Sequence, residues 1–140
     1  MTTSRSESGS CLCGKVTLHA SNVNPKFSVC HCAMCRTWGG GPFFALRSGT
    51  EVQIEGEENI TVFTSSSWAS RGFCSHCGTH LFYRLNQTGE YNVPTGFFSK
   101  AEGLEMNMQY FSDKRPSYYC FSNQSNEMTE AEIMAYFAKQ

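Results

Sequence analysis

Clustered cysteines are the feature that most constrains this chain. Seven of its eight cysteines fall into three tight groups, which are Cys11-x-Cys13, Cys30-x-Cys32-x-x-Cys35 and Cys74-x-x-Cys77. Thiols with two residues between them can chelate one tetrahedral ion, and several such groups can build a zinc site. A closed structural site takes four cysteines, so the other three would leave one coordination position open, as catalytic zinc sites do. The spacing therefore predicts one ion that holds the fold and one that does chemistry.

Length and charge limit the classes of protein. A chain of 140 residues predicts one domain with a substantial core. The formal net charge of −1 shows no basic excess that would indicate nucleic acid as a partner, and no apolar stretch is long enough to span a membrane. The first ten residues are polar and lack the apolar centre of a secretory signal. We therefore expect a disordered tail over residues 1–8, a single domain over residues 9–140 and a cytoplasmic location.

Cytosolic thiols are kept reduced, so clustered cysteines there are expected to bind metal rather than to form disulfides. Iron–sulfur ligation is the weaker alternative, because none of the spacings follows the common ferredoxin runs. Cys120 stands apart from the groups. Its expected role is that of an inert buried thiol.

Turn residues separate short segments that are rich in β-branched and aromatic residues, which predicts a mainly β fold of antiparallel sheets. The expected strands cover residues 15–20, 51–55, 60–63 and 80–85, residues 106–110 carry a weaker strand pattern, and residues 43–46 are an apolar run. The glycines at positions 39–41 and Pro42 predict a loop.

The C-terminus carries the pattern of one short helix. Thr129 and Glu132 form a capping box, in which each side chain bonds a backbone amide of the other residue. Ile133, Tyr136 and Phe137 share one face, which predicts that the helix packs on the sheet. A frayed, exposed terminus is the alternative.

Local spacing suggests which cysteines act together but leaves the pairing open. Cys74-Ser-His-Cys77-Gly78 has the form of a zinc knuckle, and Cys11-Leu-Cys13-Gly14 is a tighter version. These two segments together would supply the four sulfurs of a closed structural site. In the alternative pairing, Cys32 and Cys35 join Cys74 and Cys77 in a single zinc ribbon.

The segment Cys30-His-Cys32-Ala-Met-Cys35 can direct three thiolates toward one ion. A fourth protein ligand would close this site as well. The candidates for that ligand are His31, His76, His80 and Cys120. Spacing excludes none of them.

Three segments together resemble one known family. They are Gly9-Ser-Cys-Leu-Cys-Gly-Lys-Val16, Cys30-His-Cys-Ala-Met-Cys-Arg36 and Phe73-Cys-Ser-His-Cys-Gly-Thr-His-Leu-Phe82. This combination resembles the glutathione-dependent formaldehyde-activating enzyme (GFA) family, which includes centromere protein V. The resemblance extends from about Gly9 to Lys114 and implies antiparallel sheets around zinc, an arrangement called a β-tent.

The resemblance also implies roles and a reaction. It assigns Cys11, Cys13, Cys74 and Cys77 to a structural zinc ion, and Cys30, Cys32 and Cys35 to a catalytic one, which makes two zinc ions per chain. The implied activity is that of a carbon–sulfur lyase, the reversible formation of S-(hydroxymethyl)glutathione from formaldehyde and glutathione. The implied partners are thus a small-molecule thiol and an aldehyde.

The charge of the three-cysteine site agrees with thiol chemistry. Three thiolates make a bound Zn²⁺ a poorer Lewis acid than three neutral histidines would, so activation of water is disfavoured. A substrate thiol can still be the fourth ligand. Two alternatives stay open: a non-catalytic module that uses the scaffold for protein contacts, and a related lyase with another thiol substrate.

The segment after Cys35 is the expected substrate contact. Arg36 can pair with a glutathione carboxylate, Trp38 can form an apolar wall, and Gly39 and Gly40 let backbone amides approach a ligand. A solvated arginine and an ordinary core tryptophan are the alternatives for the first two.

One position departs from the family pattern. Family members often carry a histidine in a late segment before a lysine, where this chain places Met108 before Lys114. If that histidine assists proton transfer, its absence removes a general acid–base group from the implied reaction. The number of subunits in the assembly cannot be read from the sequence.

Overall fold

A computed structural model of the chain describes residues 4–138. The chain folds into two compact units. The first unit holds the described residues up to 25 and residues 46–104, and the second holds residues 26–45 and those from 105 onward. That residues 9–140 work as one domain stays a prediction. The mainly β fold with a short C-terminal helix is confirmed.

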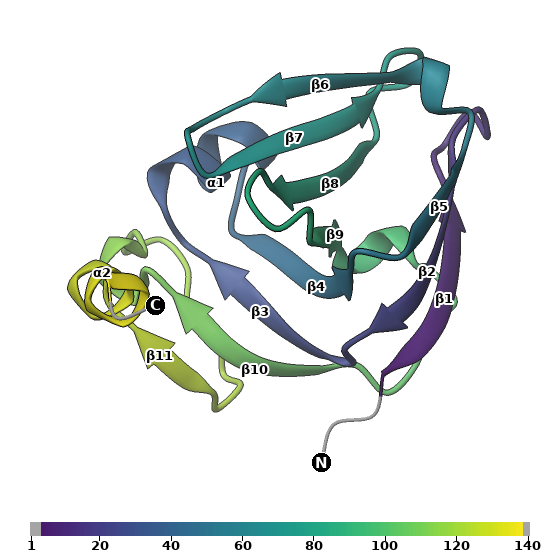
Figure 1. Cartoon of the computed structure of the whole chain (residues 1–140). Helices are drawn as coiled ribbons and strands as arrows, with labels where there is room; N and C mark the ends of the chain where they lie inside the picture. Colours follow the sequence, from purple (N-terminus) through teal and green to yellow (C-terminus); the bar gives the residue numbers. More distant parts are fainter. Residues whose placement is uncertain (1–3, 139–140) are drawn as a thin grey trace. The chain divides into compact units, whose positions relative to one another are not determined.

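The first unit consists of two strand systems and two short 3₁₀ helices (Figure 1). Strands β1 (Arg5–Ser10), β2 (Thr17–Val23) and β5 (Val52–Glu55) form an antiparallel sheet in the order β1-β2-β5. The other strands follow the order β9-β8-β7-β6, and they are β6 (Ile60–Thr64), β7 (Ala69–Cys74), β8 (His80–Leu85) and β9 (Tyr91–Pro94). The 3₁₀ helices are η1 (Glu57–Asn59) and η2 (Thr95–Phe97).

Side chains alternate between the two faces of the strands in this unit, and those on the buried face form its core. In β2, Leu18 and Ala20 are buried, while His19 between them is half-buried and faces the other side of the sheet. The largest fully buried hydrocarbon side chains of the unit are those of Val16, Leu18, Val23, Leu46, Leu81, Val93 and Phe98.

The disordered tail that we predicted for residues 1–8 is wrong for its later part. Arg5–Ser10 forms β1, and Ser8 pairs with His19 in the ladder with β2. The Ser10 and Thr17 hydroxyls also bond across it, 2.8 Å apart. Backbone pairing therefore orders a polar segment that shows no apolar alternation. Residues 1–3 lie outside the described part of the chain.

The second unit contains the remaining strands and both α-helices. Its strand order is β11-β10-β3-β4. The elements are β3 (Lys26–Cys30), α1 (Ala33–Gly39), β4 (Phe43–Gly49), β10 (Glu105–Tyr110), the 3₁₀ helix η3 (Ser112–Lys114), β11 (Asn126–Met128) and α2 (Glu130–Ala138). The last residues of β4 belong to the first unit.

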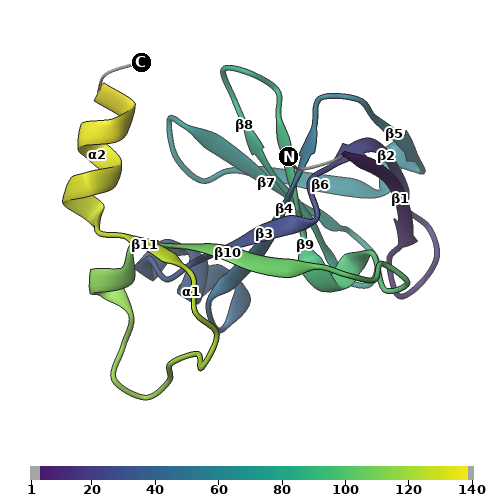
Figure 2. The same cartoon turned by 90° about the horizontal axis from the view of Figure 1, so that it is seen from below.

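The expectation of purely antiparallel sheets needs one correction. Strand β10 pairs in parallel with both β3 and β11, whereas β3 and β4 are antiparallel (Figure 1; Figure 2 shows the same strands from below). Hairpin connections enforce antiparallel pairing, but β3 and β10 are separated by about half of the chain. Side-chain packing therefore sets the relative direction of β3 and β10. The residue pattern within each strand does not reveal that direction.

A helix that was not predicted precedes the loop expected at residues 39–42, of which only Gly39 is helical. Helix α1 begins after Cys32, whose sulfur accepts a hydrogen bond from the Cys35 amide at 3.3 Å. It ends at Gly40, which has φ = 84° and donates its amide hydrogen to the Arg36 carbonyl at 2.8 Å. A left-handed residue of this kind is the usual end of a helix, so the glycine run marks the end of α1.

The C-terminal helix is confirmed with its capping box. The Thr129 amide donates to the Glu132 carboxylate at 2.9 Å, and the Glu132 amide donates to the Thr129 hydroxyl at 3.2 Å. Of the predicted packing face only Ile133 is buried, while Tyr136 and Phe137 are 54% and 46% exposed. The prediction that all three residues pack on the sheet is therefore wrong for Tyr136 and Phe137, and α2 contacts β11 and η3.

No helix within residues 4–138 has the length and apolarity that crossing a bilayer requires.

Gly72 in β7 is expected to be irreplaceable by alanine. A Cβ atom there would lie 2.4 Å from Cζ of Phe82, its cross-strand partner, which is 4% exposed. The ring cannot move without repacking, so Gly72→Ala should lower the free energy of unfolding by about 1–3 kcal/mol. That exceeds the gain of about 0.5–1 kcal/mol from replacing a strand glycine. Urea unfolding measures the change, and Gly96→Ala, which meets no atom within 4 Å, is the control. Equal stability of the two variants would contradict the expectation.

Candidate metal centres

Four sulfur atoms converge in the first unit. They belong to Cys11, Cys13, Cys74 and Cys77, hereafter the four-cysteine group, and all lie within 4.8 Å of one another. The Cys13 sulfur is 3.6 Å from that of Cys11 and 3.7 Å from that of Cys74. Thiolates about 2.3 Å from a tetrahedral zinc ion are about 3.8 Å apart. The four-cysteine group therefore has the size of a closed tetrahedral metal site.

Backbone and hydroxyl groups around the sulfurs support this geometry. The Val16 amide donates to the Cys11 sulfur at 3.3 Å, and the His76 amide donates to the Cys74 sulfur at 3.4 Å. The Thr79 hydroxyl lies 3.1 Å from the Cys77 sulfur and accepts a bond from the Leu12 amide at 3.2 Å. Such contacts stabilise thiolates and orient them toward an ion. Thr79 also connects the two cysteine segments.

The pKa values of the thiols in the four-cysteine group differ from one another. Hydrogen bonding from the Thr79 hydroxyl and amide lowers the pKa of Cys77 to about 5. The Lys15 amide lowers the pKa of Cys13, but burial and the neighbouring thiols outweigh it and raise that pKa to about 11. Four thiols at this separation cannot all ionise without a compensating cation. The donor set thus fits a divalent metal that would hold all four as thiolates.

Three sulfur atoms converge in the second unit. They belong to Cys30, Cys32 and Cys35, hereafter the three-cysteine group, and lie within 4.8 Å of one another. Cys30 ends β3, Cys32 precedes α1, and Cys35 lies in its first turn, so a strand-to-helix turn brings the sulfurs together. Cys35 is buried and the other two are half-buried. Hydrogen bonding with the Cys32 and Cys35 thiols raises the pKa of Cys30, so this group also lacks enough positive charge to ionise fully.

His31, between two of these cysteines, is fully buried and bonded at both ring nitrogens. Its Nε2 donates to the Gln109 side-chain oxygen at 2.8 Å, because that oxygen can only accept. Its Nδ1 therefore accepts from the Tyr119 hydroxyl at 2.7 Å. Burial lowers the pKa of His31, which keeps the ring neutral as this pattern requires.

The network extends beyond His31. Arg115 also donates to the Gln109 oxygen at 3.0 Å, and the Gln109 amide donates to the Ser125 hydroxyl at 3.1 Å. Arg36 Nε donates to the His31 carbonyl at 2.9 Å. The residue between Cys30 and Cys32 is thus held from several elements of the second unit.

The other proposed fourth ligands do not join the three-cysteine group. Among residues 4–138, no further histidine, cysteine or carboxylate belongs to it. His31 uses both nitrogens elsewhere, and His76 Nε2 lies 2.8 Å from the Asn59 side-chain oxygen. His80 is half-buried, and burial followed by the nearby Arg71 charge lowers its pKa. Cys120 is exposed, which corrects its expected burial.

The expected substrate contacts occupy the second unit beside the three-cysteine group in sequence. Arg36 is anchored through Nε, and Trp38 packs edge-to-face on Phe43 with ring centres 6.0 Å apart. Gly39 and Gly40 are exposed, with no atom within 4 Å of where a Cβ would lie. The Gly40 amide is already used to end α1. Contact of these residues with a substrate stays a prediction.

Met108 lies in β10, half-buried, paired with Ser28 on one side and Asn126 on the other. Its neighbour Gln109 points the opposite way and reaches His31. Sequence reasoning did not identify Gln109, Tyr119 or Arg115. Glu105, Asn107 and Gln109 are all polar residues of β10, so the sequence pattern did not distinguish the buried Gln109 from the exposed Asn107.

Comparison with known proteins now decides the family. A family model described as the glutathione-dependent formaldehyde-activating enzyme matches residues 6–114. The chain belongs to this family. An uncharacterized lyase of Schizosaccharomyces pombe is 34% identical over 132 residues, which cover 94% of this chain and 96% of the yeast protein.

Two further relatives of this GFA-family chain are more distant. A Halomonas elongata protein provisionally named a glutathione-dependent formaldehyde-activating enzyme is 29% identical over 83 residues, 53% of each chain. The crystal structure of a Rhodobacter sphaeroides protein superposes with a TM-score of 0.58 at 24% identity, covering 67% of this chain and 89% of that one. The structural likeness supports the fold alone.

The Gln109→Leu variant tests the network around His31. It leaves the buried Nε2–H of His31 without an acceptor, so we expect a loss of about 1–3 kcal/mol in the free energy of unfolding. Metal affinity of the three-cysteine group should fall about 10-fold or more, because outer contacts orient metal ligands. Chemical unfolding and titration with Co²⁺, followed by its thiolate absorption, measure the two effects.

The controls separate hydrogen bonding from strand stability. Gln109→Glu retains the acceptor and should recover most of both losses. Asn107→Leu changes an exposed position of the same strand and should alter neither. Unchanged Co²⁺ affinity in Gln109→Leu would show that the network does not position the cysteines.

Proposed function

We propose that this protein is a zinc-dependent carbon–sulfur lyase of thiol–aldehyde adducts, forming and cleaving S-(hydroxymethyl)glutathione. The observation that carries the proposal is the three-cysteine group, whose sulfurs converge with no fourth candidate ligand in the described part of the chain. Three ligands leave one tetrahedral position for a substrate. The family and the lyase relative agree with this chemistry.

The two cysteine groups have separate roles in the proposal. The four-cysteine group would hold a structural zinc ion, since its four donors close the coordination shell. The three-cysteine group would hold the catalytic ion, which supplies Lewis-acid stabilisation of a thiolate when bound. Cys30, Cys32 and Cys35 contribute three negative charges to that site, so a thiol suits it better than water does.

The proposed reaction is balanced in atoms and electrons. It needs no oxidant and consumes no cofactor. In the forward direction the glutathione sulfur bonds to the formaldehyde carbon, and the thiol proton ends on the former carbonyl oxygen. In reverse the carbon–sulfur bond breaks and the proton returns to sulfur. Arg36 is the proposed partner of a glutathione carboxylate, because its Nε is anchored on the His31 carbonyl and its planar fork can bind a carboxylate. Trp38, Gly39 and Gly40 complete the proposed contact.

A lyase acting on another thiol is the second candidate. Met108 stands where many relatives carry a histidine, so the group that would transfer a proton in the glutathione reaction is missing at this position. The yeast relative is named only as a lyase. The two candidates share the metal centres and differ in the thiol.

Exchange NMR of ¹³C-formaldehyde with glutathione tests the proposal. The adduct forms without a catalyst, so the expected result is a faster exchange between free and glutathione-bound formaldehyde in the presence of the zinc-loaded protein. Cysteine and N-acetylcysteine, offered at equal concentration, distinguish the two candidates. Faster exchange with one of these and not with glutathione supports the second candidate, while no acceleration with any thiol overturns both.

A further inference from the structure

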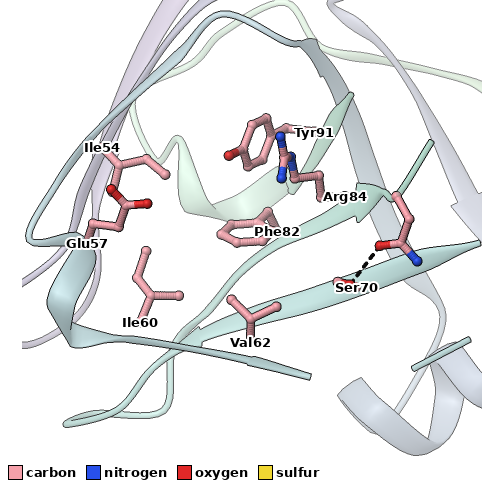
Figure 3. A pocket seen from close by; sticks show the side chains of 9 residues that line it. Ile54, Glu57, Ile60, Val62, Ser70, Phe82, Arg84 and Tyr91 are labelled. Carbon is pink, nitrogen blue, oxygen red and sulfur yellow. Dashed lines mark hydrogen bonds between the residues drawn. The ribbon is translucent and has the colours of Figure 1, made fainter. Parts of the chain in front are cut away.

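The first unit contains a cavity that the proposed reaction does not use. Its volume is about 310 Å³, at the lower end of the range for small-molecule sites. Its apolar lining comes from Ile54, Ile60, Val62, Phe82 and Tyr91 (Figure 3). No cysteine lines the cavity, so nothing in its lining calls for a metal ion or a thiol as the ligand.

The aromatic part of the lining is held in place by the sheet. Phe82 lies flat over Gly72, where any side chain would collide with its ring. Tyr91 meets Phe82 edge-to-face, with ring centres 5.0 Å apart at 87°. The cavity therefore has a preformed apolar surface, which lowers the entropic cost of binding an apolar group.

Arg84 gives the cavity a fixed positive charge. Its guanidinium lies 5.0 Å from the centre of the Tyr91 ring, and its Nε donates to the Gly89 carbonyl at 3.3 Å. Within residues 4–138, no carboxylate forms an ion pair with it. An arginine that is anchored on one side and lacks an anion is suited to bind a carboxylate of a ligand.

Glu57 gives the cavity a negative charge in a different place. In Figure 3 the Phe82 ring lies between Glu57 and Arg84. Glu57 also has no cationic partner among the described residues. The two charges, with an apolar surface between them, favour a ligand whose own charges are separated. A single amino acid carries both charges on one carbon, whereas a dipeptide places its ammonium and carboxylate on Cα atoms about 3.8 Å apart.

We propose that this cavity binds a dipeptide-sized zwitterion with an apolar side chain, with Arg84 on its carboxylate, Glu57 on its ammonium and Phe82 against its side chain. The proposal does not depend on the proposed lyase reaction, because none of the clustered cysteines lines the cavity. Its test uses neither thiol nor aldehyde.

The test titrates the ¹⁵N-labelled, zinc-loaded full chain with glycyl-phenylalanine and follows backbone amide shifts by NMR. We expect saturable shifts confined to strands around the cavity. Two matched probes remove one charge each: N-acetylglycyl-phenylalanine lacks the ammonium, and glycyl-phenylalanine amide lacks the carboxylate. Each should bind about fivefold more weakly than the zwitterion, as is typical of partly exposed ion pairs.

Variants assign the charges to residues. Arg84→Met should weaken glycyl-phenylalanine about fivefold and abolish its preference over the amide probe, while Glu57→Gln should abolish its preference over the acetylated probe. Glu58→Gln and Arg47→Met change exposed charges outside the cavity and should bind as the unmodified protein does. Absence of saturable shifts around the cavity, equal binding of the three probes, or binding that survives both lining variants overturns the proposal.

Discussion

The Cys74→Ser variant is expected to lose one metal ion and to unfold the first unit. Cys74 is fully buried, and its sulfur lies 3.7 Å from that of Cys13, 61 positions away in the chain. A metal at the four-cysteine group therefore connects the start of the unit to its middle. Binding of structural zinc contributes about 10–16 kcal/mol in small zinc domains, which is similar to or larger than the total stability of a typical domain, about 5–15 kcal/mol.

Metal analysis and circular dichroism measure this expectation. Metal content should fall from two ions per chain to one at most, and the thermal transition should disappear or shift down by tens of degrees. The matched control is Cys120→Ser, because Cys120 is an exposed cysteine outside both groups and should leave both readings unchanged. A Cys74→Ser protein that melts like the control would show that the four-cysteine group does not hold a structural metal.

The Cys32→Ser variant is expected to lose the other metal ion, and with it the activity, while keeping its fold. Cys32 is half-buried, and its sulfur accepts the Cys35 amide at the start of α1. A serine hydroxyl is a good acceptor at this helix position, so α1 should be preserved. Its neutral oxygen is a poor substitute for a thiolate ligand. The loss of a metal ligand in a catalytic site should reduce the rate of adduct exchange about 100-fold or more.

The measurements for Cys32→Ser are metal content, thermal unfolding and exchange NMR on the same preparation. One retained ion, a melting temperature within a few degrees of the unmodified protein and exchange at the uncatalysed rate would together support the division of roles. If Cys32→Ser instead unfolds as Cys74→Ser does, both sites are structural. If it retains full catalysis, the three-cysteine group is not the active site.

Strands with clear alternation were predictable from the sequence. Residues 80–85 form β8 as expected, and residues 51–55 contain β5. Strand β7 was missed because its interior residues Arg71 and Gly72 do not alternate as a half-buried strand does. Gly72 leaves room for the Phe82 ring, and this steric requirement arises only when β7 and β8 pair.

Helix α1 was not predicted from the sequence for a different reason. The glycines of positions 39–41 predicted a loop, which the structure has from Gly40 onward, but the helix before it, Ala33–Gly39, which begins after Cys32, was not predicted. A cysteine is not a usual helix cap. Its position here follows from the turn that brings it beside Cys30, and that turn is not visible in local propensities.

The sequence alone determined which cysteines are local neighbours, because spacing of two or three residues along the chain restricts how far apart their sulfurs can be. Tertiary structure decided which groups combine: Cys11 and Cys13 meet Cys74 and Cys77 through the folding of the first unit. It also decided that His31 is no ligand, since Gln109 and Tyr119 lie 78 and 88 positions away in the chain and occupy its nitrogens. Contacts over such separations depend on strand pairing and packing, which local residue patterns do not encode.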